Sequence, residues 1–289
     1  MNKRLIFTTF FILFSCLAVF GQKNKLPDFD TADFIKKQEV AEWLCKYDAI
    51  AWCTSDSVAK SDPVELQKLG GEWFCFEAAD KNWHAVYGKY EDNRMNVVFH
   101  YLVDASNKVS RINQDIDADF LNTHTRALIL ANKQIAELRD SVKIRFNQYI
   151  KLNEDKTFTV WIFPAFQPNS VAVYGGEFVY KIDKTGTEIL EDNSYFQGHF
   201  RGFQVGTPRE VWLGYTELDN PTIGTVFFVW YYKQYFTNIM LDTKYYTTTT
   251  LKAGDGKYTW IHKKKGGEKD KVEGKKTKNK KAKKEKTKK

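Results

Sequence analysis

The sequence has few cysteines, prolines and histidines, and it has no apolar run long enough to span a bilayer. Only four Cys, six Pro and five His occur among its 289 residues. Such low cysteine content excludes a disulfide-built scaffold, so we expect buried free thiols at Cys45, Cys53 and Cys75. The alternative is one bridge from Cys75 to either of the others. The histidines form no H-E-x-x-H or H-x-H motif, which excludes the common zinc-hydrolase signature.

The first 21 residues have the pattern of a secretory signal peptide. Lys3 and Arg4 precede an apolar run of sixteen residues, shorter than the ~20 needed to span a bilayer. We expect cleavage after Gly21, export to the periplasm, outer envelope or extracellular space of a bacterium, and no transmembrane helix afterwards. A lipoprotein anchored at Cys16 is the alternative, because the four residues ending there resemble a lipobox. The bulky Phe14 and the apolar residues after the cysteine favour soluble export.

Positive charge is concentrated in the last 27 residues. The chain carries a net charge of +8, but residues 263–289 contain 15 Lys and four acidic residues, whereas residues 22–262 contain 27 basic and 32 acidic ones. With only two apolar residues, this tail is predicted to be disordered and to bind polyanions electrostatically. The tail has no aromatic residue for base stacking, and residues 22–262 carry no net positive charge. Sequence-specific nucleic-acid binding is therefore not expected.

Residues 22–262 are predicted to form a single α+β domain, with a sub-boundary near residue 155. Short aromatic segments separated by turn residues are typical of antiparallel strands. We expect two β-meanders packed on a long amphipathic helix. Strands are predicted at 72–78, 82–90, 95–103, 109–112, 158–166, 171–182, 187–190, 195–203, 210–215, 225–232, 237–242, 245–251 and 258–262.

Three helices are predicted. The shortest begins at Pro63, is capped by Asp62 and runs through Leu69. Apolar residues at helical spacing follow the potential caps Asp28, Asp30 and Thr31, and they predict a helix over residues 33–52. The stronger pattern covers 117–152, where apolar residues recur every seven positions. A straight helix of that length would be long for such a domain, so we expect a bend near Asn132 or Arg139.

His84 and His100 are the candidate metal ligands. If Glu91–Asn93 forms a three-residue hairpin loop, the two imidazoles lie opposite each other on one sheet face. A carboxylate or cysteine would then complete a zinc site. A two-residue loop would separate them, and the alternative interpretation is a pair of surface or hydrogen-bonded histidines. His124 lies on an apolar helix stripe and is interpreted as a core residue, and no other cofactor is expected.

His199 and Arg201 are the candidate catalytic residues, because they lie between two glycines and could act on an anionic group. The alternative is a bulged edge strand with exposed polar residues, which we favour. The candidate ligand-binding residues form two aromatic doublets. In a strand, each doublet would send one ring to each sheet face, leaving some aromatic surface exposed. These doublets are Tyr231-Tyr232 and Tyr245-Tyr246.

Two short motifs match those of serine β-lactamases and penicillin-binding proteins. Residues 57–60 fit S-x-x-K and residues 184–186 fit K-T-G. Pro63 leaves almost no helix after Ser57, no S-D-N lies between them, and the K-T-G falls in a predicted hairpin turn. We interpret both matches as chance.

These patterns favour a non-catalytic binding or structural role in the envelope, with electrostatic retention by the tail. The rival is a secreted hydrolase, with or without a metal, using His84 and His100 or His199. The sequence does not decide whether the protein is an enzyme.

Overall fold

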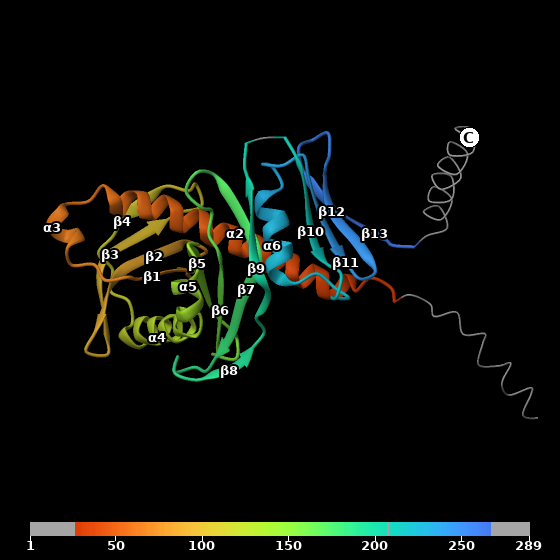
Figure 1. The fold of residues 1–289 in the computed structure, drawn as a ribbon. Coiled ribbons are helices and arrows are strands. Elements are labelled where there is room, and N and C mark those ends of the chain that lie inside the picture. Colours follow the sequence, from red (N-terminus) through yellow and green to blue (C-terminus); the bar gives the residue numbers. More distant parts are fainter. Residues whose placement is uncertain (1–26, 207, 267–289) are drawn as a thin grey trace, which may run out of the picture. The chain divides into compact units, whose positions relative to one another are not determined.

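The computed structural model describes residues 27–206 and 208–266, and it has an α+β fold (Figure 1). Residues 31–263 form one compact unit, and the described chain ends outside it belong to a second unit. The helices are α2 (Thr31–Ala59), α3 (Pro63–Leu66), α4 (Ala118–Gln134), α5 (Ala136–Ser141) and α6 (Ile223–Tyr232). The strands are β1 (Glu72–Glu77), β2 (Trp83–Glu91), β3 (Arg94–Val103), β4 (Val109–Arg111), β5 (Phe146–Leu152), β6 (Phe158–Pro164), β7 (Val171–Ile182), β8 (Ile189–Asp192), β9 (Tyr195–Gln204), β10 (Glu210–Tyr215), β11 (Asn238–Thr243), β12 (Tyr246–Lys252) and β13 (Tyr258–Lys264).

The strands form three sheets. Sheet 1 is the antiparallel meander β1-β2-β3-β4, and sheet 2 has the order β5-β6-β7-β8 with β9 also paired to β7. Sheet 3 has the order β10-β11-β12-β13, and its first pair is parallel. The meander of sheet 1 follows the predicted strand order, whereas sheet 3 is mixed and not purely antiparallel.

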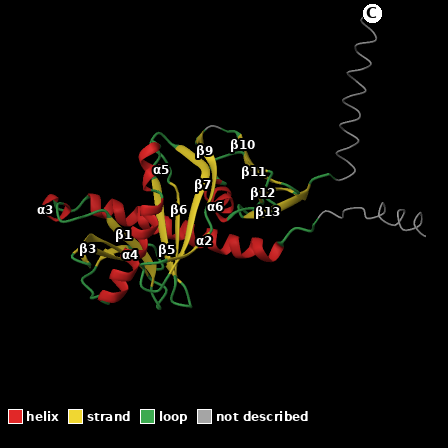
Figure 2. Cartoon of the chain, turned by 60° about the horizontal axis from the view of Figure 1, so that its bottom comes forward, coloured by secondary structure: helices red, strands yellow, loops and turns green. Residues whose placement is uncertain are grey.

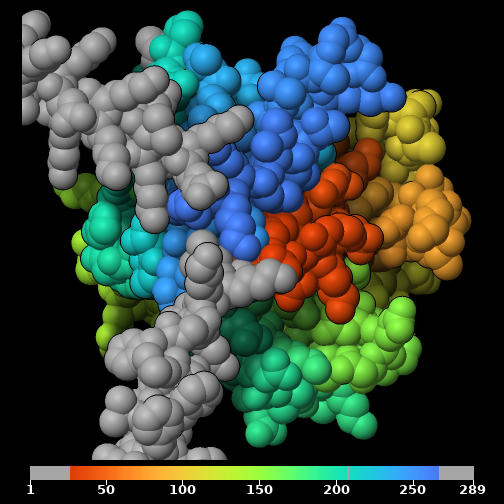
Figure 3. Space-filling view, turned by 90° about the vertical axis from the view of Figure 1, so that its right-hand side faces the viewer, coloured from red at the N-terminus to blue at the C-terminus, as the bar shows by residue number. Residues whose placement is uncertain are grey.

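Helix α2 connects the two ends of the main unit. It contacts β1, β2, β3 and β5, and it also contacts α6; Figure 2 shows the helix running past sheets 1 and 2 toward sheet 3. Near its start, the Phe34 ring packs edge-on against Trp260, with centroids 5.0 Å apart. In Figure 3 the first turns of α2 (red) lie beside the C-terminal strands (blue). One helix therefore contributes to the packing of most of the fold.

Two apolar cores lie on different sides of sheet 2. The first is formed by α4 with residues of sheets 1 and 2, and it includes the fully buried Phe74, Phe158 and Ile182. The second is formed by α6, sheet 3 and the first half of β7, and it includes Leu213 and Val229. Burying side chains of this size is the main stabilising contribution to each core.

The predicted helix over 117–152 is wrong from Val142 onward. Helix α4 is capped by Asp117, which accepts a hydrogen bond from the Phe120 N–H, and it ends at Gln134. A short α5 follows, and Val142 is already extended (φ −121°, ψ 144°). Residues 146–152 then form β5, which pairs with β6 across a hairpin that contains residue 155. The seven-residue recurrence continued by coincidence into a strand with alternating apolar residues.

The strand predicted at 225–232 is also wrong, because these residues form α6. Thr222 caps the helix by accepting a hydrogen bond from the Thr225 N–H at 3.3 Å. A short, continuous apolar run of aromatic and β-branched residues fits either a buried strand or a buried helix. Because α6 crosses from β10 to β11, those two strands run parallel.

The C-terminal boundary lies slightly beyond the predicted one. β13 extends to Lys264, two residues past the predicted domain end at His262. In the second unit, Lys264 Nζ lies 3.4 Å from Asp28 Oδ1. The predicted signal peptide and most of the predicted tail lie outside the described residues. Within the described ranges, no helix combines the length and apolar character needed to cross a membrane.

Candidate functional site

A pocket of about 250 Å³ lies against one face of α2, beside β1, β2 and β5. Its α2 residues recur at spacings of three and four, so a single helix face forms one wall. The buried end is Asp48, which is 3% exposed, and the rim includes Trp52, which is 51% exposed. The lining residues are Asp48, Ala51, Trp52, Ser55, Trp73, Tyr87 and Asn147.

Asp48 is a buried carboxylate held by neutral donors from three elements. Its Oδ1 accepts hydrogen bonds from Asn147 Nδ2 at 2.8 Å and from the Tyr149 hydroxyl at 2.9 Å, both on β5. Its Oδ2 accepts one from the Tyr231 hydroxyl of α6 at 2.6 Å, and Trp52 is a further side-chain partner. Burial raises the pKa of Asp48, while these hydrogen bonds lower it. The carboxylate thus ties α2 to β5 and α6.

Aromatic rings form the side of the pocket opposite α2. Trp73 and Tyr87 are directly paired across β1 and β2, and their rings stack with centroids 6.2 Å apart and an interplanar angle of 17°. The Tyr87 hydroxyl is fixed by a hydrogen bond of 2.8 Å with Thr54 Oγ1. The pocket therefore combines ordered rings, one half-exposed Trp and a carboxylate at its base.

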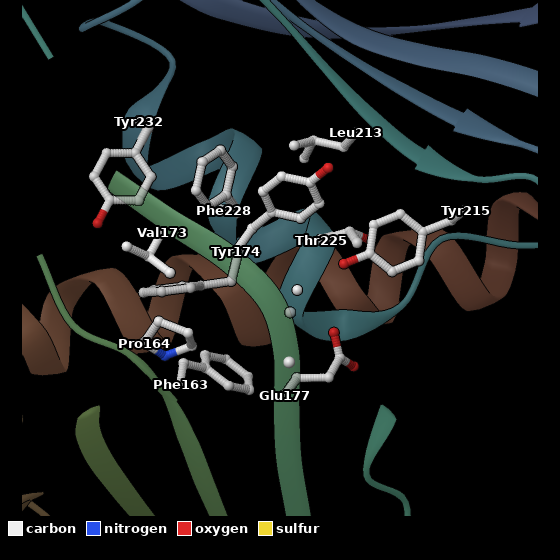
Figure 4. Close-up of a pocket in the computed structure, with 14 residues that line it drawn as sticks. Phe163, Pro164, Val173, Tyr174, Glu177, Leu213, Tyr215, Thr225, Phe228 and Tyr232 are labelled. Carbon is white, nitrogen blue, oxygen red and sulfur yellow. The ribbon is translucent and has the colours of Figure 1, made fainter. Parts of the chain in front are cut away.

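A second buried carboxylate, Glu177 of β7, lies at the N-terminus of α6 (Figure 4). Thr222 Oγ1 donates to its Oε2 at 2.6 Å, and the backbone N–H groups of Gly224 and Thr225 also donate to it. A Cβ atom at Gly224 would clash with the carboxylate, so this close approach requires glycine. Burial nevertheless raises the pKa of Glu177 to about 7.

The cavity beside Glu177 is too small for an organic ligand. It measures about 20 Å³ and is lined by residues of β6, β7, β10 and α6. Figure 4 shows Tyr174, Tyr215 and Thr225 around it. A space of this size holds about one water molecule. Glu177 therefore anchors β7 to α6 and does not face a binding pocket.

His84 and His100 are brought together, but not in the predicted register. The hairpin loop is Asp92-Asn93, with two residues, and a bulge at Tyr87-Gly88 shifts the pairing so that His84 faces Leu102. The two histidines are diagonal neighbours on one sheet face. Their rings still meet, with His84 Nδ1 2.8 Å from His100 Nε2.

The contact between the two rings is a hydrogen bond. His100 Nδ1 lies 3.2 Å from the Gln114 carbonyl; because a carbonyl only accepts, His100 Nε2 accepts from His84 Nδ1–H. Burial lowers the pKa of both histidines. Two nitrogens bound to one tetrahedral zinc would be about 3.3 Å apart, so a metal would need the rings to separate.

His100 also lines a hollow of about 680 Å³ on the β3 side, together with Arg94, Arg111 and Asp115. Arg111 is already engaged by Glu65, with Nη2–Oε1 at 2.6 Å. No group of three His, Cys, Asp or Glu placed to hold a metal occurs in residues 27–206 and 208–266. Zinc at this site stays a prediction, and metal content tests it.

The structure does not bring His199 and Arg201 into a common site with an acid. Both are exposed on β9, which pairs with β7 opposite a bulge at Tyr174–Gly176. His199 Nδ1 bonds the nearby Gln197 carbonyl at 3.2 Å, and Arg201 Nη1 donates to the Tyr174 hydroxyl at 3.2 Å. This geometry matches the bulged edge strand that the sequence favoured.

The aromatic doublets lie on different elements. Tyr231 and Tyr232 are on α6, so the expectation of one ring on each sheet face does not apply to them. Tyr231 instead binds Asp48 behind the pocket, and Tyr232 is buried in the second core. Tyr245 precedes β12, and Tyr246 at its start is buried. None of the four lines the pocket over Asp48.

The remaining sequence candidates have structural roles. His124 is 2% exposed and donates from Nδ1 to the Phe120 carbonyl at 2.7 Å; burial lowers its pKa to about 4. Ser57 Oγ donates to the Cys53 carbonyl inside α2, far from the arrangement that an S-x-x-K nucleophile needs. The described cysteines are free thiols, and burial raises the pKa of Cys45 to about 12, which leaves it unreactive.

No protein-family model matches this chain, and no similar curated protein and no similar solved structure was found. The α+β architecture and the geometry of its pockets are therefore the grounds for inferring a function.

Proposed function

We propose that the chain is an exported, non-catalytic binding protein and that the pocket over Asp48 is its binding site. The observation that carries the proposal is the coincidence of a half-exposed Trp52, the stacked Trp73–Tyr87 pair and a buried carboxylate in one cavity. Pockets lined by aromatic side chains with a few polar groups are typical of small-ligand sites. At about 250 Å³, this one is smaller than the roughly 300–1,000 Å³ of drug-sized sites, so it suits a small ligand.

Replacing Trp52 with Ala is expected to weaken ligand binding about ten-fold or more, because a large aromatic contact at the rim is lost. Binding is followed by isothermal titration with choline, acetate and methyl β-glucopyranoside as chemically different probes. Trp212→Ala is the matched control, since Trp212 is 50% exposed on β10 and does not line the pocket. The proposal would be contradicted if none of the three probes bound, or if Trp52→Ala and Trp212→Ala lost the same affinity.

Residues 263–289 are proposed to retain the protein at polyanionic surfaces. Truncation after Gly266 leaves β13 complete and is expected to abolish binding to phosphatidylglycerol vesicles without changing the melting temperature. Binding of the full chain should fall steeply with salt, since multivalent ion pairing is screened. A tail with glutamine at each lysine beyond 266 is the control for length, and a lower melting temperature after truncation would show that the tail is part of the fold.

The rival proposal, a metal-dependent hydrolase, is favoured by one observation: the His84–His100 contact beside a hollow that His100 lines. We expect the purified mature chain to hold far less than one zinc per molecule, because these ring nitrogens already bond each other and Gln114. Elemental analysis of the chain and of His84→Ala is the measurement. Near-stoichiometric zinc that is lost in the variant would make the hydrolase the leading hypothesis.

A further inference from the structure

We propose that the pocket over Asp48 binds a small organic cation, either a quaternary ammonium group or a protonated amine. This inference rests on the proposed binding function and specifies its ligand. Three features of the pocket carry it: an uncompensated carboxylate, aromatic walls, and polar side chains that are already engaged.

Within the described part of the chain, the carboxylate of Asp48 has no cationic partner. Its hydrogen-bond donors are the side chains of Asn147, Tyr149, Tyr231 and Trp52, all neutral. None of the residues that line the cavity is Lys, Arg or His. Neutral donors spread a negative charge without cancelling it, so the potential inside the cavity stays negative. A cationic ligand gains from this field without replacing any hydrogen bond of Asp48.

The walls of the pocket suit an ammonium group. The faces of Trp, Tyr and Phe rings carry partial negative charge and attract cations, and Trp does so most strongly. Trp52, Trp73 and Tyr87 supply three rings from α2, β1 and β2. Trp73 and Tyr87 form the wall opposite α2 and Trp52 lies on α2, so aromatic rings flank a ligand from two sides.

Two other ligand classes fit less well. A sugar can stack on Trp52, but it also needs hydrogen-bonding groups, and the donors of Ser55 and Asn147 are used internally. Ser55 Oγ donates to the Trp52 carbonyl at 2.9 Å, and the Asn147 amide donates to Asp48. An anion would be repelled by Asp48 and would find no positive side chain in the lining.

The test compares two ligands of the same shape that differ in charge. The mature full-length chain is titrated with choline and with its neutral isostere 3,3-dimethylbutan-1-ol. We expect choline to bind about ten-fold more tightly or better. Asp48→Asn should remove most of this preference, because it removes the charge and nearly preserves the shape. Trp52→Ala should weaken both ligands, and Trp212→Ala should weaken neither.

The outcomes separate this inference from the proposed function. Equal binding of the two isosteres, or tighter binding of methyl β-glucopyranoside than of choline, would overturn the cation while leaving the pocket as the binding site. Tighter binding of n-butylamine than of choline would support the cation and assign it to protonated amines. If no probe binds the wild-type chain at millimolar concentration, both the ligand and the binding site are wrong. The comparison of ligands needs no mutant, so it holds even if Asp48→Asn fails to fold.

Discussion

Asp48→Ala is expected to lower the free energy of unfolding by about 3 kcal/mol. The substitution leaves the hydroxyls of Tyr149 and Tyr231 and the amide of Asn147 without their acceptor. A buried donor that loses its partner costs about 1–3 kcal/mol, more when the partner was charged. The variant no longer has to bury a carboxylate, which offsets part of the loss. Water that enters from the pocket can also bond the freed donors, so the total loss stays well below the summed cost of three unpaired donors. Urea unfolding at pH 7 measures the difference.

Two further variants show whether the loss belongs to this network. Asp48→Asn keeps an acceptor oxygen in the same place, so it should lose less stability than Asp48→Ala. Asp56→Ala removes an exposed carboxylate from the same helix and should change stability by less than about 0.5 kcal/mol. If Asp48→Ala behaved like Asp56→Ala, the carboxylate would not be what joins α2, β5 and α6.

Glu177→Gln is expected to remove a pH dependence of stability of about 3 kcal/mol between pH 4.5 and pH 7. In the folded chain the pKa of Glu177 is raised from 4.5 to about 7 by burial. Between these two values the folded state binds a proton that the unfolded state has released. The free energy of unfolding therefore falls as pH rises from 4.5 to 7. Above pH 7, Glu177 adds no further pH dependence. The expected sign is opposite to that of a carboxylate held in a salt bridge.

The measurement is the free energy of unfolding of the wild type and of Glu177→Gln from pH 4.5 to 8. We expect the two curves to lie closest at the acidic end and to separate as pH rises, with the variant the more stable at pH 8. Glu188→Gln removes an exposed charge and is the control for a general change in net charge. Parallel curves for the wild type and Glu177→Gln would show that the carboxyl does not titrate in this range.

Much of the fold follows from local sequence patterns. The four strands of the first meander and β10 lie where alternating apolar residues and turn residues predict them. The two errors arose where one pattern fits two structures. The seven-residue repeat of α4 continued into β5, where residues from Val142 onward alternate. The apolar run of α6 has strand-like composition, and only the Pro221-Thr222 cap signals a helix.

The candidate site was less predictable. Asp48 lies one turn after Leu44 on the buried face of α2, and an acidic residue on an apolar stripe is the signal that could have marked it. Its partners Asn147, Tyr149 and Tyr231 are about 100 and 183 residues away, and no local pattern predicts such contacts. The histidine contact depended on a β-bulge, which the sequence of the hairpin does not specify.

The position of α2 has a consequence for how the chain is made. This helix is the first element of the described chain, yet its partners include Pro221, whose carbonyl accepts a hydrogen bond from Lys37 across 184 residues, and Tyr231. During synthesis most of the remaining chain must emerge before these surfaces of α2 can be covered, and such distant pairings form slowly. Slow folding of this kind would suit the export proposed above, because a chain that crosses a membrane in extended form folds only on the far side.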